Sequence, residues 1–416
     1  FTVYEAEDRV GGNAVTLRYG DFFFDSGAHR FHDRDKEITA ELRNLLGEDF
    51  RKIEVPSKIC FNGKFIDFPL SPLDLMKKLG LWTFARAGVE LLAARAGKGS
   101  TEMNFREFAV MTYGKTMAEF FLLNYSEKLW GKPCDELSVR IAGKRMKGLD
   151  LKTFLKEAFR GSRAKTEHLD GAFYYPKHGF GSVVEKLAAC CGDENIRKNT
   201  CITRIFHDHK RITKIELNGS EQREVDRVVS TLPLPHLVKL MSPRPPVEVL
   251  SLAEGLQFRD LIVVTVFIDR ASIMKDGSVY FPESGFPFTR VYEPRNRSKE
   301  MSPPGKTSLC AEIPCFPTSA LWNMDEEKLA QLIASYFVKL RWIDKEDIID
   351  YKVTKLRNAY PVLETGFEQK SHMLADFFES FVNMKLAGRN GRFVYAHFHD
   401  MMRFGRDVIG AYISEK

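Results

Sequence analysis

The segment that most constrains the fold lies at the start of the chain, where residues 3–13 read VYEAEDRVGGN. A short apolar strand there ends in Glu5, and the pair Gly11 and Gly12 follows in the next turn. In doubly wound nucleotide-binding folds, an acidic residue at the end of the second strand accepts hydrogen bonds from ribose hydroxyls. A glycine pair lets a pyrophosphate approach the backbone closely, because it has no Cβ. The segment predicts a parallel α/β sheet with a dinucleotide site, although an ordinary surface turn with an incidental glutamate remains the alternative.

The chain opens with Phe1, already inside an apolar run. In such folds a glycine-rich turn precedes the acidic residue by about 20 residues, which places it before residue 1. The first strand is central in a doubly wound sheet, so we expect a gap or an exposed edge beside residues 1–4. Since that turn normally carries the pyrophosphate, we also expect the chain as given to bind a dinucleotide weakly or not at all.

Charge and cysteine content narrow the partners and the compartment. The excess of 62 Lys and Arg over 56 Asp and Glu gives a net charge of +6 without a strongly basic cluster. This argues against nucleic acid as a partner and permits an acidic substrate or an anionic membrane surface. The seven cysteines show no CxxC spacing, which favours reduced thiols in a cytoplasmic protein. A mean hydropathy of −0.27 excludes a polytopic membrane protein.

Periodicity and turn residues predict short strands and one helix in the first 70 residues, and then a helical stretch at 73–159. A hairpin is expected at 55–68 with its turn at Asn62 and Gly63. We expect a proline-rich loop at 282–317 and a helix at 326–340. The other expected elements are strands at 1–4, 22–25, 172–175, 201–206, 212–217, 227–231, 261–268 and before Gly388, and helices at 37–46 and after Asp400.

No linker rich in glycine or serine divides the chain, so we expect two domains that are each built from separated segments. The nucleotide-binding domain is expected at 1–60, 170–245 and 385–416, with a parallel Rossmann-like sheet. The substrate domain is expected at 61–169 and 246–384, with helices and a mixed or antiparallel sheet.

Further segments follow the opening motif in a recognisable order. Together with residues 3–13 they resemble the superfamily of FAD-dependent amine oxidases, protoporphyrinogen oxidases and UDP-galactopyranose mutases. The segments are FDSGAHRFHD (24–33), YYPKHGFGSVVEKLA (174–188), NTCITRI (199–205), VVSTLP (228–233) and LAGRNGRFVYAHFHDMM (386–402). The resemblance is weak across 244–380.

The resemblance implies FAD as the cofactor and assigns residues to it. The residues implied are Glu5 at the ribose, Gly11, Gly12 and Asn13 in the glycine turn, Gly27, Ala28 and His29 beside the flavin ring, Ile202 at adenine, and Gly388, Arg389, Asp400 and Met401 in the closing motif. The chain departs from amine oxidases at Glu7 and Asn13, where arginine is usual. It also departs at His399, where aspartate is frequent, so the ribitol contact stays open between His399 and Asp400.

Histidines near the expected flavin ring allow two interpretations. His29 and His32 lie three residues apart, but a metal site would need a third ligand, and only Asp25 and Asp33 are nearby. We therefore predict no metal. By resemblance His29 would hydrogen-bond flavin or substrate, and the alternative is a structural histidine bonded to backbone.

Two basic segments bear on the substrate and on partners. The resemblance places 124–148 on the substrate side, where its cations would suit a carboxylate or phosphate, although a solvated helix face has the same pattern. Segment 75–98 is an expected apolar helix with five Lys or Arg and one Glu. It fits either a helix lying on a membrane surface or a cap helix packed on its neighbours.

The first functional hypothesis is an FAD-dependent oxidoreductase that takes a hydride from an apolar or cyclic small molecule, as protoporphyrinogen oxidases and desaturases do. Such a site needs no obligatory side-chain base, so no catalytic residue is assigned. The second hypothesis is a mutase-like flavoprotein acting on a nucleotide sugar, with Arg140, Arg145 and Arg290 as candidate diphosphate ligands. The third is a non-catalytic relative that binds a partner or a lipid.

Overall fold

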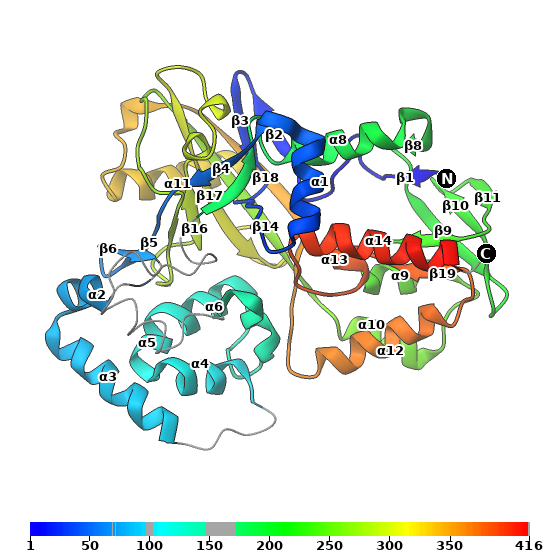
Figure 1. Ribbon diagram of the computed structural model, residues 1–416, viewed down its shortest axis with the longest axis horizontal. Helices are drawn as coiled ribbons and strands as arrows, with labels where there is room; N and C mark the ends of the chain where they lie inside the picture. Colours follow the sequence, from blue (N-terminus) through cyan, green and yellow to red (C-terminus); the bar gives the residue numbers. More distant parts are fainter. Residues whose placement is uncertain (69, 71, 97–102, 147–171, 415–416) are drawn as a thin grey trace.

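The computed structural model describes all residues except 69, 71, 97–102, 147–171 and 415–416 (Figure 1). The side of the molecule for which the sequence predicts nucleotide binding contains two short parallel strand pairs: β1 (Val3–Tyr4) with β8 (Ile196–Arg197), and β12 (Val228–Ser230) with β19 (Met384–Leu386). Within the described chain β1 pairs on one side only, and Phe1 is 82% exposed. The exposed edge that we expected beside residues 1–4 is therefore present.

Helices pack around these strands. α1 (Lys36–Leu46) begins after Asp35, whose carboxylate accepts from the Ile38 N–H, and ends at Gly47 with a φ of +59°. This agrees with the helix expected at 37–46. The other elements of this side are β9 (Ile202–His207), β10 (Ile212–Leu217), β11 (Glu221–Glu224), β13 (Met241–Ser242), α8 (Gly181–Cys191), α9 (Leu234–Leu240), α10 (Val247–Glu254), α12 (Phe367–Glu379), α13 (Gly388–Gly391) and α14 (Phe398–Ser414).

A seven-stranded mixed sheet forms the second part, in the order β18-β14-β17-β16-β15-β5-β6. Only the β15–β5 pair is parallel within this sheet. The hairpin of β5 and β6 turns at Asn62 and Gly63, as expected. The strands are β5 (Ser57–Phe61), β6 (Lys64–Phe68), β14 (Phe258–Ile268), β15 (Ser278–Tyr280), β16 (Arg290–Tyr292), β17 (Thr307–Cys315) and β18 (Ile348–Pro361).

The loop expected at 282–317 is wrong, because it contains β16 and the whole of β17. Every residue of β17 is buried, so the strand shows no alternation of polar and apolar residues. Glu312 and Pro314 also interrupt its apolar run. Pairing with β14 on one side and β16 on the other forms this strand, and neither partner is visible in the local sequence.

The two faces of the sheet are covered by different elements. Ile262 and Val264 of β14 pack in one cluster with α11 (Glu326–Lys339), a helix expected at 326–340. Val263 and Phe267 point the other way, toward the hairpin of β2 (Thr16–Tyr19) and β3 (Phe22–Asp25). The sheet is therefore enclosed on both sides, which explains the complete burial of its central strands.

The helical stretch expected at 73–159 is described up to residue 146, and 147–171 lies outside the described residues. The single helix expected at 75–98 is wrong, because Gly80, with a φ of +90°, separates two helices. A strand pair, β4 (Phe50–Glu54) with β7 (Ala172–Pro176), flanks α1. The helices of this stretch are α2 (Pro72–Leu79), α3 (Leu81–Ala96), α4 (Phe105–Tyr113), α5 (Lys115–Ala118) and α6 (Asn124–Trp130).

The domain boundary expected between residues 60 and 61 lies inside β5, which belongs with β6 to the seven-stranded sheet. The rest of the proposed division of the chain stays a prediction.

Candidate functional site

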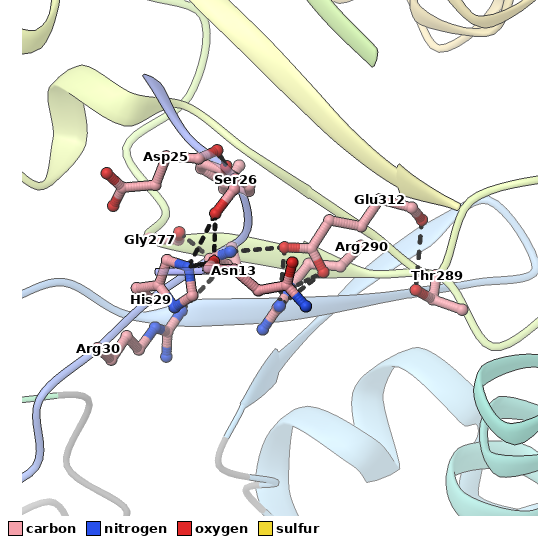
Figure 2. A network of polar contacts seen from close by, with 12 residues as sticks. Asn13, Asp25, Ser26, His29, Arg30, Gly277, Thr289, Arg290 and Glu312 are labelled. Carbon is pink, nitrogen blue, oxygen red and sulfur yellow. Dashed lines mark hydrogen bonds and ion pairs between the residues drawn. The ribbon is translucent and has the colours of Figure 1, made fainter. Parts of the chain in front are cut away.

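The segment Gly27–His29 follows β3 and is held by a residue of the seven-stranded sheet (Figure 2). The Ala28 N–H donates to Oε1 of Glu312 at 2.6 Å. Glu312 is also the carboxylate of a buried ion pair, since the Arg290 guanidinium donates to both of its oxygens at 2.6–2.9 Å. Burial disfavours the charge of Arg290, and Glu312 more than offsets this, so the pKa of Arg290 lies well above its usual value.

His29 sits at the centre of the polar network that Figure 2 shows. Its Nε2 lies 3.1 Å from the Asn13 carbonyl oxygen and 3.3 Å from the Ser26 hydroxyl. A carbonyl oxygen only accepts, so Nε2 carries the proton and donates it. Burial lowers the pKa of His29, although the charges of Asp25 and Glu312 oppose this shift. The ring is therefore a neutral donor that ties the segment after β3 to the turn at Asn13.

Asp25 anchors the same region through its side chain. Its side chain accepts from the Thr16 hydroxyl at 2.6 Å, the Tyr175 hydroxyl at 2.6 Å and the Phe180 N–H at 3.0 Å. Arg297 lies beside it with its guanidinium 4.2 Å from the centre of the Tyr292 ring, and it is only 2% exposed. Both carboxylate oxygens of Asp25 thus accept hydrogen bonds from protein groups.

Aromatic residues from α6, β15, β18 and the segment after α13 gather around the Arg290–Glu312 pair. Tyr125 of α6 lies 5.9 Å from Tyr280 of β15 between ring centroids, and the Arg290 guanidinium lies 5.8 Å from the centre of the Tyr280 ring. Burial raises the pKa of both Tyr125 and Tyr360, so both phenols stay neutral. Trp130 and Tyr395 continue this wall, with centroids 5.3 Å apart.

The nucleotide turn forms a second group at the carboxyl end of β1. Backbone bonds join this end to residues 197–200, since the Thr200 N–H donates to the Glu5 carbonyl at 2.8 Å, and Ile202 begins the next strand. One carboxylate oxygen of Glu5 accepts the Glu7 N–H at 2.9 Å. A Cβ on Gly11 would lie 3.0 Å from the Ala14 carbonyl oxygen, whereas one on Gly12 would meet no atom within 4 Å. Glu5 therefore lies beside the segment that leads to Ile202, whereas Gly11 lies against Ala14 and Val184.

The closing motif reaches the group around His29. Gly388 has a φ of +75°, and Arg389 donates to the Ala359 carbonyl and stacks on Tyr360 at 5.7 Å. The charge of Arg389 also acts on the pKa of His29. Asp400 lies in the first turn of α14, where its carboxylate accepts the His397 N–H at 2.9 Å, and Met401 follows it.

The basic segment 124–148 is largely engaged with protein groups. Lys132 pairs with Glu364 at 2.8 Å, and Arg140 pairs with Glu368 at 3.3 Å while staying 74% exposed. Lys128 donates to the carbonyls of Phe281 and Glu283, and burial lowers its pKa to about 7. The side chain of Arg145 lies outside the described part. Arg140 and Arg290 therefore do not form one cluster.

Sequence reasoning missed Glu312 and Arg297 and gave Arg290 a different role. Glu312 lies 284 residues from Ala28, so no local pattern connects them. A charged residue within an apolar strand was the available indication, and it was hidden by the incorrect loop at 282–317.

Metal binding and membrane crossing each require a particular arrangement of side chains or helices. No group of three His, Cys, Asp or Glu side chains in the described part of the chain has the arrangement of a metal site. None of the described helices combines the length and the apolar character needed to cross a membrane.

Comparison with known proteins gives a family. The profile of the family described as flavin-containing amine oxidoreductases matches residues 1–399. Protoporphyrinogen oxidase 1 of Arabidopsis thaliana chloroplasts is 26% identical over 144 residues, which is 34% of this chain and 27% of that protein.

The solved structures share the fold over nearly the whole chain. A reduced UDP-galactopyranose mutase has a TM-score of 0.83 and 18% identity, covering 99% of this chain and 90% of that one. A protein of Exiguobacterium sp. 255-15, provisionally named a protoporphyrinogen oxidase, has a TM-score of 0.79 and 18% identity, covering 100% and 93%.

Proposed function

Because the chain belongs to the family of flavin-containing amine oxidoreductases, we propose that it is an FAD-dependent oxidoreductase whose substrate is an apolar or cyclic small molecule. The flavin, when bound, supplies a ring that accepts a hydride from a substrate carbon. The task left to the residues of this chain is to hold the two reactants.

The residues present fit a dinucleotide cofactor. Glu5 stands at the carboxyl end of a parallel strand, where ribose hydroxyls are bound in such folds. The backbone at Gly12 is open, because a Cβ there would meet no atom within 4 Å, so a pyrophosphate has room to approach. We assign Glu5, Gly11, Gly12, Asn13 and Ile202 to the nucleotide part. We assign Gly27, Ala28, His29, Gly388, Arg389, Asp400 and Met401 to the flavin part.

The observation that carries the substrate class is the aromatic lining of the region beside Gly27–His29, where Tyr125 and Tyr280 lie near the Arg290–Glu312 pair. The Arg290 charge is matched by Glu312, and the lowered pKa of Lys128 removes much of its charge near neutral pH. Tyr125 and Tyr360 stay uncharged. A site of this kind favours an apolar ring over a phosphate or carboxylate.

The protein side of the reaction is positioning and exclusion of water. Glu312 fixes the backbone of Ala28, and the neutral His29 holds the same segment to Asn13. Aromatic side chains from α6, β15 and β18 enclose the substrate and keep its C–H bond in line. No described side chain has to remove a proton for this reaction.

The test begins with FAD uptake by the purified full-length protein. We expect oxidised flavin absorption after incubation with FAD, and bleaching when a reduced tetrapyrrole such as protoporphyrinogen is added without oxygen. Admitting oxygen should restore the colour. Glu5→Gln should weaken FAD binding by about tenfold, since one charge-assisted hydrogen bond is lost. Glu7→Gln, two residues along, is the matched control and should bind FAD as the unaltered chain does.

A full-length protein that takes up no FAD would support the non-catalytic alternative and contradict the proposal. Turnover of UDP-galactopyranose only under a reductant, without net oxidation, would replace it with the mutase alternative. That alternative needs a cationic diphosphate site, and Arg290 is already paired while Arg140 lies at the surface.

A further inference from the structure

The outward face of α3 has the opposite polarity to an ordinary surface helix. Trp82 is 88% exposed, Leu81 69%, Val89 68% and Leu92 66%. We call these four residues, with the exposed Ala85, Gly88 and Ala93 between them, the outer face of α3. Among the described side chains of α3, Arg86 is the charged residue on this face. Monomeric soluble proteins rarely expose contiguous apolar surface of this kind without a function.

The inward face of α3 is fixed by its packing, so the helix cannot turn its apolar side inward. Phe84 belongs to a core cluster with residues of β5, β6 and the helices, and Ala87 is buried. The backbone of α3 also packs closely against Gly114. A Cβ added to Gly114 would lie only 3.0 Å from the backbone nitrogen of Leu91. In Figure 1, α2 and α3 run along the outer rim of the molecule with α4 and α5 behind them.

Acidic and basic side chains of α2 and α3 lie on different sides of these helices. Both acids turn inward: Asp74 is 16% exposed and pairs with Lys78, and Glu90 is 22% exposed and pairs with Arg86. Glu90 also accepts the Thr116 N–H at 2.6 Å. The Arg86 side chain is 70% exposed, and Lys77 is exposed in the last turn of α2. The solvent side therefore combines apolar side chains with cations and presents no exposed acid among the described residues.

We propose that the outer face of α3 docks on an anionic lipid bilayer, with the helix lying in the plane of the interface. A tryptophan and leucines between cations are the composition of helices that lie in that interface. The exposed cations complement anionic headgroups, and the long Arg86 side chain can reach the headgroups from within the apolar face. A second copy of the chain fits less well, because stable protein interfaces use about 20–30 residues a side.

This docking would orient the molecule. α4, α5 and α6 lie behind α3, and α6 carries Tyr125 and Trp130 of the aromatic site. The inference rests on the surface and does not depend on the proposed reaction, so it is tested without an activity assay.

The experiment is co-sedimentation of the full chain with vesicles. We expect binding to phosphatidylcholine vesicles that contain about one third phosphatidylserine, and binding at least fivefold weaker to phosphatidylcholine alone. Raising the salt concentration should weaken the binding to anionic vesicles. Val89→Gln and Trp82→Ala should each lower the partition coefficient by about tenfold, because each removes apolar area from the interface.

Val382→Gln is the matched control, because Val382 is also 68% exposed but follows α12, far from α3 in Figure 1. It should leave vesicle binding unchanged. All three residues are exposed, so the folded state of each variant can be verified by an unchanged thermal transition. The proposal is wrong if the unaltered chain stays in the supernatant with anionic vesicles, or if V89Q and V382Q reduce binding equally. A dimer seen by sedimentation velocity without lipid, and lost in V89Q, would also overturn it.

Discussion

Single residues decide how the two halves of the candidate site are joined. Glu312 of the sheet holds Ala28 beside the proposed flavin ring, and His29 holds the same segment to Asn13. The family resemblance in the sequence assigned Asn13, Ala28 and His29 to the cofactor. Glu312 was not assigned, because its role depends on a contact across 284 residues that no local pattern reveals. The cofactor side stays a prediction of the resemblance, whereas the residues that support it became visible only in the fold.

Because the Arg290–Glu312 ion pair is buried, we expect substitutions of its two side chains to have strongly non-additive effects on the free energy of unfolding. Removing one partner leaves a buried charge, so Glu312→Gln should lower the free energy of unfolding by about 3–5 kcal/mol. Adding Arg290→Met to it should recover part of the loss, giving a coupling of about 2 kcal/mol in a denaturation cycle. The surface pair Arg51–Glu300 is the control and should couple by less than about 1 kcal/mol. Additive effects at Arg290 and Glu312 would contradict this account.

The lowered pKa of His29 leads us to expect a loss of folding stability in mild acid. Its pKa in the folded state is lowered by burial, so the unfolded state binds the proton first as the pH falls. The contribution of neutral His29 is complete above about pH 6.5 and declines as the pH falls toward the folded pKa. Urea unfolding at about pH 7.5 and about pH 5.5 should show a smaller pH dependence for His29→Gln. His178→Gln, at an exposed histidine, should keep the full dependence of the unaltered chain.

Elements with local determinants were predictable, and elements formed by distant pairing were not. Asp35 and Gly47 mark the ends of α1, and Asn62 with Gly63 marks the hairpin, so these features were found from the sequence. β17 was missed because it is buried on both faces and its partners lie far along the chain. The break at Gly80 was missed because a lone glycine inside an apolar pattern is compatible with a continuous helix.

The end of α6 gives a prediction at this scale. Gly131 ends the helix with a φ of +72°, and a Cβ there would lie 2.6 Å from the guanidinium of Arg259. Arg259 donates to the carbonyls of Lys128 and Leu129 in the last turn of α6. Gly131→Ala should therefore destabilise the protein by more than about 2 kcal/mol, through left-handed strain and displacement of Arg259.

At Gly405 we expect the opposite effect of alanine on the free energy of unfolding. It lies within α14 and a Cβ there would meet no atom within 4 Å. Gly405→Ala should stabilise the protein by about 0.5–1 kcal/mol, because alanine loses less backbone entropy in a helix. If both substitutions shift the urea midpoint alike, the C-terminal glycine of α6 has no special role.

At the scale of the whole molecule, an aromatic contact joins the seven-stranded sheet to the hairpin of β2 and β3. Phe267 of the sheet lies 4.6 Å from Tyr19 and 4.8 Å from Phe22 between ring centroids, both of which belong to the hairpin that leads to Gly27–His29. We expect the two parts to unfold together, because the hairpin that covers one face of the sheet also carries the candidate cofactor segment.

Phe267→Ala tests this coupling. The substitution should lower the free energy of unfolding by about 3–5 kcal/mol. Hydrogen exchange should report the same loss for peptides of β14 and of α8, which lie in different parts. Val382→Ala, at an exposed position, should change neither the free energy of unfolding nor the hydrogen exchange of these peptides. Exchange in α8 that is unaffected by F267A would mean that the two parts open independently.

The parallel pairing of β5 with β15 has a consequence for how the chain reaches its fold during synthesis. β5 begins at residue 57, and its partner β15 is made about 220 residues later. At translation speeds of about 5–20 residues per second, roughly 10–45 seconds pass between the synthesis of β5 and that of β15. Ile59, Phe61 and Ile66, which are buried in the finished protein, are unprotected by that strand during this interval. The emerging chain is therefore expected to need a chaperone until β18 completes the sheet.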